Sequence, residues 1–516
     1  MGVNGAESLL AAAQEAGVAV CFANPGTTEI PLVEAFDSVE GVRTVLGLSE
    51  GVVTGAADGY ARMTGRPAMT LLHLGPGFAN GIANLHNARR ARTPIINVVG
   101  EHATWHQAAD APLASDIDSL ARPVSGWVGR TSGAAAAASE FLDARQAALR
   151  ERMPVTLIAA ADHMWGDGGQ RAAVPPEPAL ATVDGQRVAG IAKLLAGPGR
   201  PALLLGGSAL NADGLRLGAR IAAATGGEVF AERSPARVER GPDIPVVRSL
   251  PYFPEDTLAA LDGFTHLVLV GAGVPVAFFG YRGQPSVPVP EHVQVHTLAD
   301  LDENAVDALG AVAEAIGASG VEPPPRDRPA LRAPEGELHA KAVATAIALT
   351  QPDRSIIVNE GITAAAAYPA VAAAAPAHTE LGLTGGAIGM GIPVATGAAL
   401  ACPDRPVIDL QADGSAAYTL QGLWTQARER LDVTTVICAN SRYRILEAEL
   451  GRAGVRTPGP AATGMTSLGD PATDWVSLAT GFGVPAARVT TGEELLAALH
   501  NAHTTPGPHL IEAVLP

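Results

Sequence analysis

Residues 408–440 constrain the fold more than any other segment, because they hold two apolar runs separated by a tight turn and a helical pattern. The helical part places apolar side chains on one face, at Leu420, Leu423, Trp424, Ala427 and Leu431. A strand–helix–strand unit of this kind closes with a right-handed crossover, which makes its two strands parallel. The segment therefore predicts a parallel sheet covered by helices.

Similar alternations of short apolar runs and helical patterns occupy three stretches of the chain. Two proline-rich segments, residues 174–180 and 321–338, separate them and favour neither helix nor strand. We therefore expect an α/β protein of three doubly wound, parallel-sheet domains, over residues 1–173, 181–320 and 335–516.

Two oxygen-bearing side chains are expected to meet at one edge of the last sheet. Asp413 follows the first strand of the unit and Asn440 follows the second. The carboxyl ends of parallel strands share an edge, and α/β sheets bind ligands there. Carboxylate and amide oxygens suit Mg2+, and the backbone N–H groups of a helix that opens at Gly414 and Ser415 suit a phosphate. Asp-Gly is also a common turn, so the pattern alone leaves a purely structural role open.

Residues 408–440 resemble the thiamine-diphosphate motif, which begins with Gly-Asp-Gly and ends with Asn-Asn. The resemblance implies that Asp413, Asn440 and the backbone carbonyl of Arg442 bind Mg2+, which anchors the diphosphate of the cofactor. Alanines replace the first glycine and the first asparagine of the motif, and neither change removes a ligand. The chain is similar to thiamine-diphosphate-dependent 2-oxo acid decarboxylases and acetolactate synthase large subunits. Its layout is close to that of benzoylformate decarboxylase.

Such enzymes need a carboxyl group at the aminopyrimidine of the cofactor, where it helps to generate a carbanion at C2 of the thiazolium ring. Glu50 is the candidate, because residues 48–68 resemble the corresponding family segment. A glutamate in the first turn of a helix is also common for electrostatic reasons alone. The resemblance further implies that residues 1–173, 181–320 and 335–516 are the aminopyrimidine-binding (PYR), middle and diphosphate-binding (PP) domains.

Two further segments of the last domain resemble cofactor-binding parts of the family. In the glycine-rich residues 383–400, Ile388 occupies the position of the bulky apolar residue beneath the bent cofactor. This stretch matches a dinucleotide-binding fingerprint poorly, because its glycine spacing differs and no acidic residue ends a following strand at the required distance. In residues 359–363, Thr363 retains a hydroxyl group for the diphosphate.

The expected substrate-facing residues differ from those of benzoylformate decarboxylase. Thr27 falls where that enzyme has an active-site serine, and His73 falls on its first active-site histidine. A histidine there could relay protons to a bound intermediate or simply be hydrogen-bonded to a loop. Phe279 takes the place of the second catalytic histidine, and Glu447 and Glu449 make the segment after the motif more polar. These changes argue against benzoylformate as the substrate.

The resemblance implies a thiamine-diphosphate- and Mg2+-dependent enzyme that adds the C2 carbanion to a 2-oxo acid and releases CO2. Protonation then gives an aldehyde, whereas addition to a second carbonyl gives a carboligation product, as in acetolactate formation. The alternatives are a lyase of 2-hydroxyacyl compounds and a non-catalytic cofactor-binding homologue. FAD is not assigned, because the short middle stretch has no convincing flavin signature. His102 and His106 fit a substrate contact, a proton relay or a solvated loop equally well.

Charge and cysteine content limit the partners and the compartment. A formal net charge of −17 disfavours nucleic-acid binding, and no uncharged apolar run is long enough to predict a membrane span. Three isolated cysteines predict neither a disulfide framework nor a thiolate zinc site, which indicates a reduced, cytoplasmic protein. The resemblance implies a homodimer as the minimal active unit, with Glu50 of one subunit at the diphosphate site of another, and commonly a homotetramer.

Overall fold

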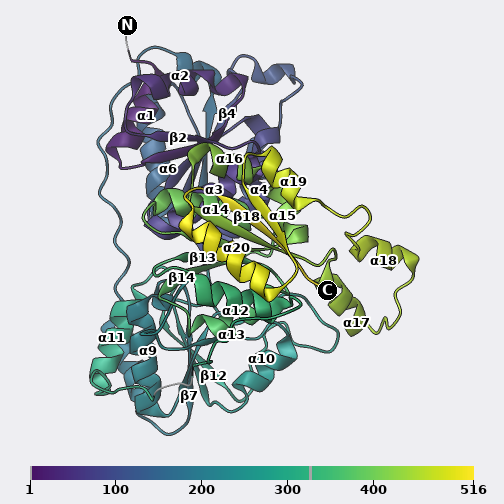
Figure 1. Cartoon of the computed structure of the whole chain (residues 1–516). Helices are drawn as coiled ribbons and strands as arrows, with labels where there is room; N and C mark the ends of the chain where they lie inside the picture. Colours follow the sequence, from purple (N-terminus) through teal and green to yellow (C-terminus); the bar gives the residue numbers. More distant parts are fainter. Residues whose placement is uncertain (1–2, 325–327) are drawn as a thin grey trace. The chain divides into compact units, whose positions relative to one another are not determined.

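The computed structural model describes residues 3–324 and 328–516. Three mainly parallel sheets with accompanying helices confirm the expected α/β fold (Figure 1). The residues form two compact units: the first consists of residues 1–178, 331–371 and 383–516, and the second of residues 179–330 and 372–382. None of the described helices is long and apolar enough to cross a bilayer.

The first sheet of the first unit has the parallel strand order β2-β1-β3-β4-β6-β5. Its central strands β3, β4 and β6 are buried along their whole length, as expected where helices cover both faces of a sheet. The strands are β1 Val20–Asn24, β2 Arg43–Leu46, β3 Ala68–Leu72, β4 Ile95–Glu101, β5 Val128–Arg130 and β6 Pro154–Ala160. The helices are α1 Gly5–Glu15, α2 Ile30–Ser38, α3 Glu50–Thr64, α4 Leu74–Ala91, α5 Ile117–Ala121, α6 Ala137–Glu151 and α7 Ala161–Trp165.

A second set of parallel strands in the first unit has the order β17-β18-β16-β15-β13. The strands are β13 Ile356–Glu360, β15 Val407–Ala412, β16 Val433–Ala439, β17 Ala486–Val489 and β18 His509–Val514. The helices are α12 Ala340–Thr350, α14 Gly391–Ala401, α15 Asp413–Thr419, α16 Gly422–Glu429, α17 Arg444–Arg452, α18 Pro460–Thr466, α19 Trp475–Gly481 and α20 Gly492–Thr504.

The helical pattern between β15 and β16 forms two helices, α15 and α16, and not the single helix that its periodicity predicts. At the junction the N–H of Leu423 bonds to the carbonyl of Leu420, and the N–H of Trp424 bonds to that of Gln421. These bonds span three residues and tighten the chain locally. Leu423 and Leu431 are buried, as predicted, whereas the other members of the expected face are half-buried.

The second unit has its own sheet, with the parallel order β10-β8-β7-β11-β12. Its strands are β7 Pro201–Leu205, β8 Glu228–Ala231, β10 Arg248–Ser249, β11 His266–Val270 and β12 Gln294–Ala299, and an antiparallel pair joins β9 Arg237–Arg240 to β14 His378–Gly382. Its helices are α8 Gly185–Leu195, α9 Ala212–Thr225, α10 Pro254–Leu261 and α11 Ala305–Ala315. An aliphatic core fills the space between these helices and the sheet.

Helices α3 and α14 pack closely and join the early and late segments of the first unit. Glycines make this approach possible. A Cβ atom at Gly59 would overlap the backbone of Val394, and one at Gly397 would overlap the carbonyl of Ala56. The two helices therefore touch backbone to backbone at these positions.

Candidate active site

Asp413 and Asn440 lie just past the ends of two paired parallel strands, as the sequence predicts. Ala412 of β15 is in register with Cys438 of β16, which brings the two following turns to one edge of the sheet. The Asp413 carboxylate accepts a hydrogen bond of 2.7 Å from the N–H of Ser441, so the first turn is tied to the second. The arrangement is the one expected for ligand binding at a sheet edge.

A pocket of about 290 Å3 opens at this edge. Its lining residues come from both turns and from the chain around α18 and β18, and include Asp413, Gly414, Ala439, Ser441, Tyr443, Leu468, Arg488 and Glu512. Burial raises the pKa of the Asp413 carboxyl above its ordinary value, although several backbone N–H groups oppose this shift. A Cβ atom at Gly414 would overlap the ring of Tyr443, so the glycine is required there. Gly414 and Ser415 are buried in the first turn of α15.

The turn after Asn440 is closed by a local hydrogen bond. The Asn440 amide oxygen accepts a hydrogen bond of 3.0 Å from the N–H of Arg442, and Ser441 adopts a φ of 55°. In the described part of the chain, no recorded hydrogen bond uses the Arg442 carbonyl oxygen. No three His, Cys, Asp or Glu side chains gather into a metal-binding cluster among the described residues. A cation here would therefore be held by mixed carboxylate, amide and carbonyl oxygens, which suits Mg2+ better than Zn2+.

A buried carboxylate, Glu360, holds the glycine-rich loop that contains Ile388. At the end of β13 it accepts hydrogen bonds from the N–H groups of residues 389–391, at 2.9, 3.0 and 2.7 Å, and one of 3.0 Å from the Gln411 side chain. Burial raises the pKa of Glu360, and these four donors act against that shift. The sequence analysis did not identify Glu360, because nothing in its neighbourhood shows that a distant loop turns its N–H groups toward it.

The opposite side of the same loop is held by asparagines of α4. The Asn87 amide donates to the carbonyl of Ala387 at 2.7 Å, and Asn84 donates to that of Gly389 at 3.3 Å. Asn80 lies on the same face of α4, four residues before Asn84. One helix face therefore contacts the Ile388 loop and, through Asn80, the carboxylate of Glu50.

Glu50 begins α3 and is buried. Its two carboxylate oxygens accept hydrogen bonds of 3.0 Å, one from the amide of Asn24 at the end of β1 and one from the amide of Asn80. A carboxylate that accepts from two neutral amides in a buried place retains capacity for a further partner. The position at the helix start is the predicted one, and the two asparagines were not foreseen.

His73 lies between the end of β3 and the start of α4 and pairs with a buried glutamate. Its Nδ1 lies 2.8 Å from the carboxylate of Glu29, which also accepts from the hydroxyl of Thr28. Gly77 separates this pair from Glu50, because a Cβ atom there would lie 3.0 Å from a Glu50 oxygen and 3.3 Å from Cβ of His73. The two candidate catalytic groups therefore lie on the same edge of the first sheet. Glu29 was missed, although its loop was recognised.

The remaining residues of the first unit that the sequence singled out are at least partly accessible. Thr27 is exposed at the start of a short 3-10 helix, and Thr363 is half-buried after β13. His102 and His106 lie together, with ring centroids 5.4 Å apart. The His102 Nε2 atom is buried and has no hydrogen-bond partner among the described residues. A bound molecule or water could satisfy it.

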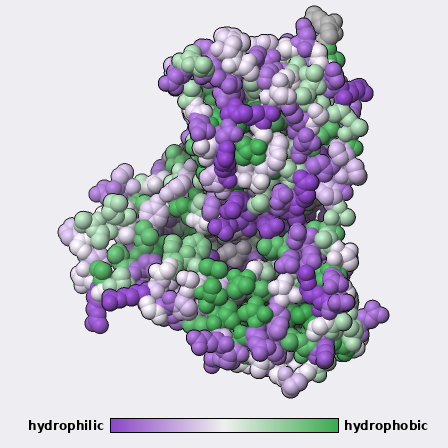
Figure 2. Space-filling view, turned by 180° about the vertical axis from the view of Figure 1, so that it is seen from behind, coloured by the Kyte–Doolittle hydropathy of each residue, from purple (hydrophilic) through white to green (hydrophobic). Residues whose placement is uncertain are grey.

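Phe279 belongs to the second unit, where 53% of its surface is exposed. It packs against Phe278, whose ring also lies 4.5 Å from the guanidinium of Arg233. Val274 and Val276 in the same loop are likewise exposed. Figure 2 shows apolar surface gathered on the second unit. The loop thus presents apolar side chains, and the predicted role of Phe279 at the substrate stays a prediction.

Comparisons with known proteins match both ends of the chain to thiamine-dependent enzymes. The N-terminal thiamine-pyrophosphate-binding domain of these enzymes matches residues 3–121, and the C-terminal one matches residues 362–513. A Mycobacterium tuberculosis (strain H37Rv) protein named provisionally as an acetolactate synthase large subunit, IlvX, is 51% identical over 100% of this chain and 99% of its own. Benzoylformate decarboxylase of Pseudomonas aeruginosa is 31% identical over 96% of each chain.

Solved structures show the same fold. The thiamine-diphosphate-dependent 4-hydroxybenzoylformate decarboxylase of Rhodococcus jostii RHA1 superposes with a TM-score of 0.86 over 99% of both chains, at 24% identity. A thiamine-diphosphate-dependent protein from Mycobacterium smegmatis gives a TM-score of 0.83 over 100% of both chains. Together with the geometry at the two sheet edges, these relationships identify the chain as a member of the thiamine-pyrophosphate-dependent enzymes that include acetolactate synthases and benzoylformate decarboxylases.

Proposed function

We propose that this enzyme acts on a small 2-oxo acid and releases CO2. The carbanion that remains would then either be protonated, which gives an aldehyde, or add to a second carbonyl compound. The observation that supports this most directly is the placement of Glu50 beside the His73–Glu29 pair, on either side of Gly77. At one edge of the sheet, a buried carboxylate thus lies near an imidazole that a second carboxylate orients. Such a pair of groups is suited to proton transfer. The relatives named for acetolactate synthesis and benzoylformate decarboxylation use 2-oxo acids of this class.

The pocket at Asp413 fits the diphosphate and its metal ion. Asp413, Asn440 and the carbonyl of Arg442 would hold Mg2+, while the N–H groups of Gly414 and Ser415 would receive diphosphate oxygens. Thr363 would add a hydroxyl contact to the diphosphate, and Ile388 would support the bent cofactor. Thiamine diphosphate, when bound, supplies the nucleophilic C2 atom and the electron sink for decarboxylation.

Glu50 would hold a proton at the pyrimidine nitrogen of the cofactor. Asn24 and Asn80 would keep both oxygens of this carboxyl group in place. His73 would deliver or remove a proton at the substrate-derived oxygen or carbon, with Glu29 fixing the tautomer and orientation of its ring. Thr27 would lie on the substrate side of the same loop.

The substrate is proposed to be aliphatic. Phe279 offers no proton where benzoylformate decarboxylase has a histidine, and the α17 segment contributes Glu447 and Glu449 in place of apolar residues. A polar, acidic segment is a poor cover for a phenyl ring. Pyruvate and short branched 2-oxo acids are therefore preferred candidates over benzoylformate.

The test is CO2 release from a panel of 2-oxo acids, with and without thiamine diphosphate and Mg2+. Turnover should require both additions, and thermal-shift titration should show that they stabilise the protein together. Tight cofactor binding without CO2 release from any acid would refute the 2-oxo acid assignment. Cleavage of a 2-hydroxyacyl thioester into an aldehyde and a formyl thioester, measured by chromatography under the same conditions, would then favour the lyase alternative.

Glu50→Gln tests the role of the carboxyl group directly. The variant should lose about 10²–10⁴ in rate, because general acid–base groups contribute on that scale. Asn24→Ser, which removes only one of the two amide donors, is the matched control and should retain most of the activity. An unchanged rate in Glu50→Gln would remove this residue from the proposed mechanism.

A further inference from the structure

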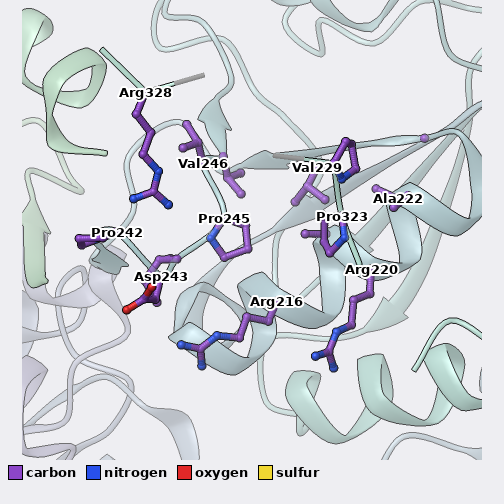
Figure 3. Close-up of a pocket in the computed structure, with 16 residues that line it drawn as sticks. Arg216, Arg220, Ala222, Val229, Pro242, Asp243, Pro245, Val246, Pro323 and Arg328 are labelled. Atoms are coloured by element: carbon purple, nitrogen blue, oxygen red, sulfur yellow. The ribbon is translucent and has the colours of Figure 1, made fainter. Parts of the chain in front are cut away.

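The second unit contains a pocket of about 360 Å3 that plays no part in the proposed reaction. It lies between α9, the start of β8, residues 242–247 and the chain at Pro323 and Pro324 (Figure 3). All of its lining residues belong to the second unit. Its volume falls within the range of pockets that hold small molecules, about 300–1,000 Å3.

Arginine side chains surround the pocket. Arg216 and Arg220 extend from α9 on one side, and Arg328 approaches from the other (Figure 3). Arg216 and Arg220 are four residues apart, so they share one face of the helix. Asp243, which is exposed, is the single acidic residue among the described residues that line the pocket. The lining is therefore strongly positive in a chain whose formal net charge is −17.

These arginines form few and weak interactions with other groups of the protein. Arg216 is paired with Asp213 on its own helix at 3.2 Å, in an exposed geometry that contributes little to stability. Arg328 donates a hydrogen bond of 3.3 Å to the carbonyl of Ala373, which leaves its charge unpaired by any acid in that contact. Arg220 has no recorded ion pair or hydrogen bond to the described residues. Grouped guanidinium groups of this kind are stabilised by an anion between them.

The inner wall of the pocket is apolar and rigid. Ala219 and Ala223 continue the arginine face of α9 inward, and Val229, Ile244 and Val246 lie opposite them. Four prolines frame the pocket, at positions 242, 245, 323 and 324. Because proline fixes φ, the frame is formed before any ligand arrives, which lowers the entropic cost of binding.

We propose that this pocket, here called the arginine pocket, binds a small organic anion with a short apolar body. The carboxylate or phosphate group would pair with Arg216 and Arg220, because guanidinium groups bind such groups in a bidentate manner. The body would pack against Ala219, Ala223 and Val229. The proposal does not depend on the proposed function, since it concerns a separate ligand and different residues.

Calorimetric titration of the full-length protein tests this with five probes. Hexanoate and hexyl phosphate have both an anionic group and an apolar body, acetate and inorganic phosphate have only the anionic group, and hexanamide has only the body. Hexanoate or hexyl phosphate should bind at least about tenfold more tightly than the other three. Whichever of the two binds better identifies the anionic group. Binding of hexanamide as tight as that of the better anionic probe, or no binding of any probe, would overturn the proposal.

Three variants locate the bound probe. Arg216→Gln with Arg220→Gln should weaken binding of the better probe by on the order of 10²-fold, since each lost charged contact contributes about tenfold. Ala223→Leu fills the apolar wall and should abolish the advantage of hexanoate over acetate while leaving the arginines in place. Arg171→Gln removes the same charge from a side chain that is 86% exposed in the first unit, and should change nothing.

The active site is a competing location for a carboxylate probe, and the variants distinguish the two. Binding at the active site would be lost in Glu50→Gln or His73→Ala and retained in the double arginine variant. The proposal requires the opposite result. Unchanged melting temperatures of the arginine variants in buffer would show that lost binding does not reflect lost folding, and hexanoate binding that survives both arginine substitutions would exclude the arginine pocket.

Discussion

At the scale of single residues, the protein depends on carboxyl groups whose partners are remote in sequence. Glu29 orients His73, Glu360 holds a loop of the PP segment, and Glu50 is held by two asparagines. Each of these groups is buried and receives several hydrogen bonds. Each carboxylate connects several partners, so replacing the carboxylate itself should have a larger local effect than removing one of its donors.

The Glu29–His73 pair makes a prediction of this kind. Glu29→Gln should lower turnover by about 10- to 10³-fold, because the amide can no longer hold the imidazole in one tautomer or stabilise its charged form. His73→Ala should have a similar effect. If the two residues act as a unit, the double variant should be little worse than His73→Ala alone. Fully additive losses in a kcat/KM double-mutant cycle would show that Glu29 acts independently of His73.

Glu232 provides a residue-scale prediction about stability. Burial raises the pKa of its carboxyl from 4.5 to about 7, against a hydrogen bond from the N–H of Gly207. The folded protein therefore binds a proton more tightly than the unfolded chain, so the contribution of Glu232 to stability is complete below pH 4.5 and is lost as pH rises through 7. The free energy of unfolding should therefore fall by on the order of 1–3 kcal/mol when the pH is raised from 5 to 8.

Urea unfolding at these two pH values measures the effect. Glu232→Gln removes the titration and should make the difference in unfolding free energy between pH 5 and 8 smaller than in the wild type. Glu314→Gln, at an exposed position on α11, is the matched control and should leave that difference unchanged. Equal pH dependence in the Glu232 variant and the wild type would contradict the raised pKa.

At the scale of elements, the contact between α3 and α14 joins the segments that contain Glu50 and Ile388. It depends on glycines that allow the two backbones to meet, most clearly at Gly397 against the carbonyl of Ala56. Gly397→Ala should destabilise the protein by about 1–3 kcal/mol, because the added methyl group forces the helices apart. Gly190→Ala, inside α8 and with open space around it, should instead stabilise by about 0.5–1 kcal/mol.

Thermal unfolding should show a lower melting temperature for Gly397→Ala and a higher one for Gly190→Ala than for the wild type. Since α4 and α14 flank the Ile388 loop, Gly397→Ala should also weaken binding of thiamine diphosphate. A Gly397→Ala protein as stable as the wild type would show that the helices can separate without cost.

At the scale of the whole molecule, the family relationship predicts that one active site is built from two subunits. Glu50 of one chain would then serve the diphosphate pocket at Asp413 of another. Mixing the inactive variants Glu50→Gln and Asp413→Asn should restore activity, because a mixed dimer contains one site in which both residues are native. The recovered activity should approach about a quarter of the wild-type value for random pairing in an equimolar mixture, since half of the dimers are mixed and each has one of two sites.

Each variant by itself is the control for this mixture. Incubated alone under the same conditions, neither variant should regain activity, and size-exclusion chromatography of the mixture should show a dimer or a larger assembly. Complete absence of activity in a mixture that has demonstrably exchanged subunits would place Glu50 and Asp413 of the same chain in one site.

Local sequence was sufficient for the parts of the site that depend on chain neighbours. The strand–turn–helix–strand pattern of residues 408–440 predicts parallel strands, and parallel strands necessarily bring Asp413 and Asn440 to one edge. The alternation of apolar strand and helix patterns likewise predicts that Glu50 begins a helix and that His73 follows a strand. The sequence analysis missed the split of the expected helix into α15 and α16, because the apolar periodicity continues across it, although Gly422 lies inside the tightened turn.

The sequence by itself determined the α/β class, the cofactor family and the sheet edge at which the cofactor would bind, because these follow from short-range periodicity and a linear motif. Only the tertiary structure decided that Glu29 faces His73, that Glu360 receives the N–H groups of residues 389–391, and that Arg216 and Arg220 border a pocket with Arg328. These contacts join residues distant in the chain. Their formation depends on how sheets and helices pack, and no local pattern encodes which distant side chain a buried charge will meet.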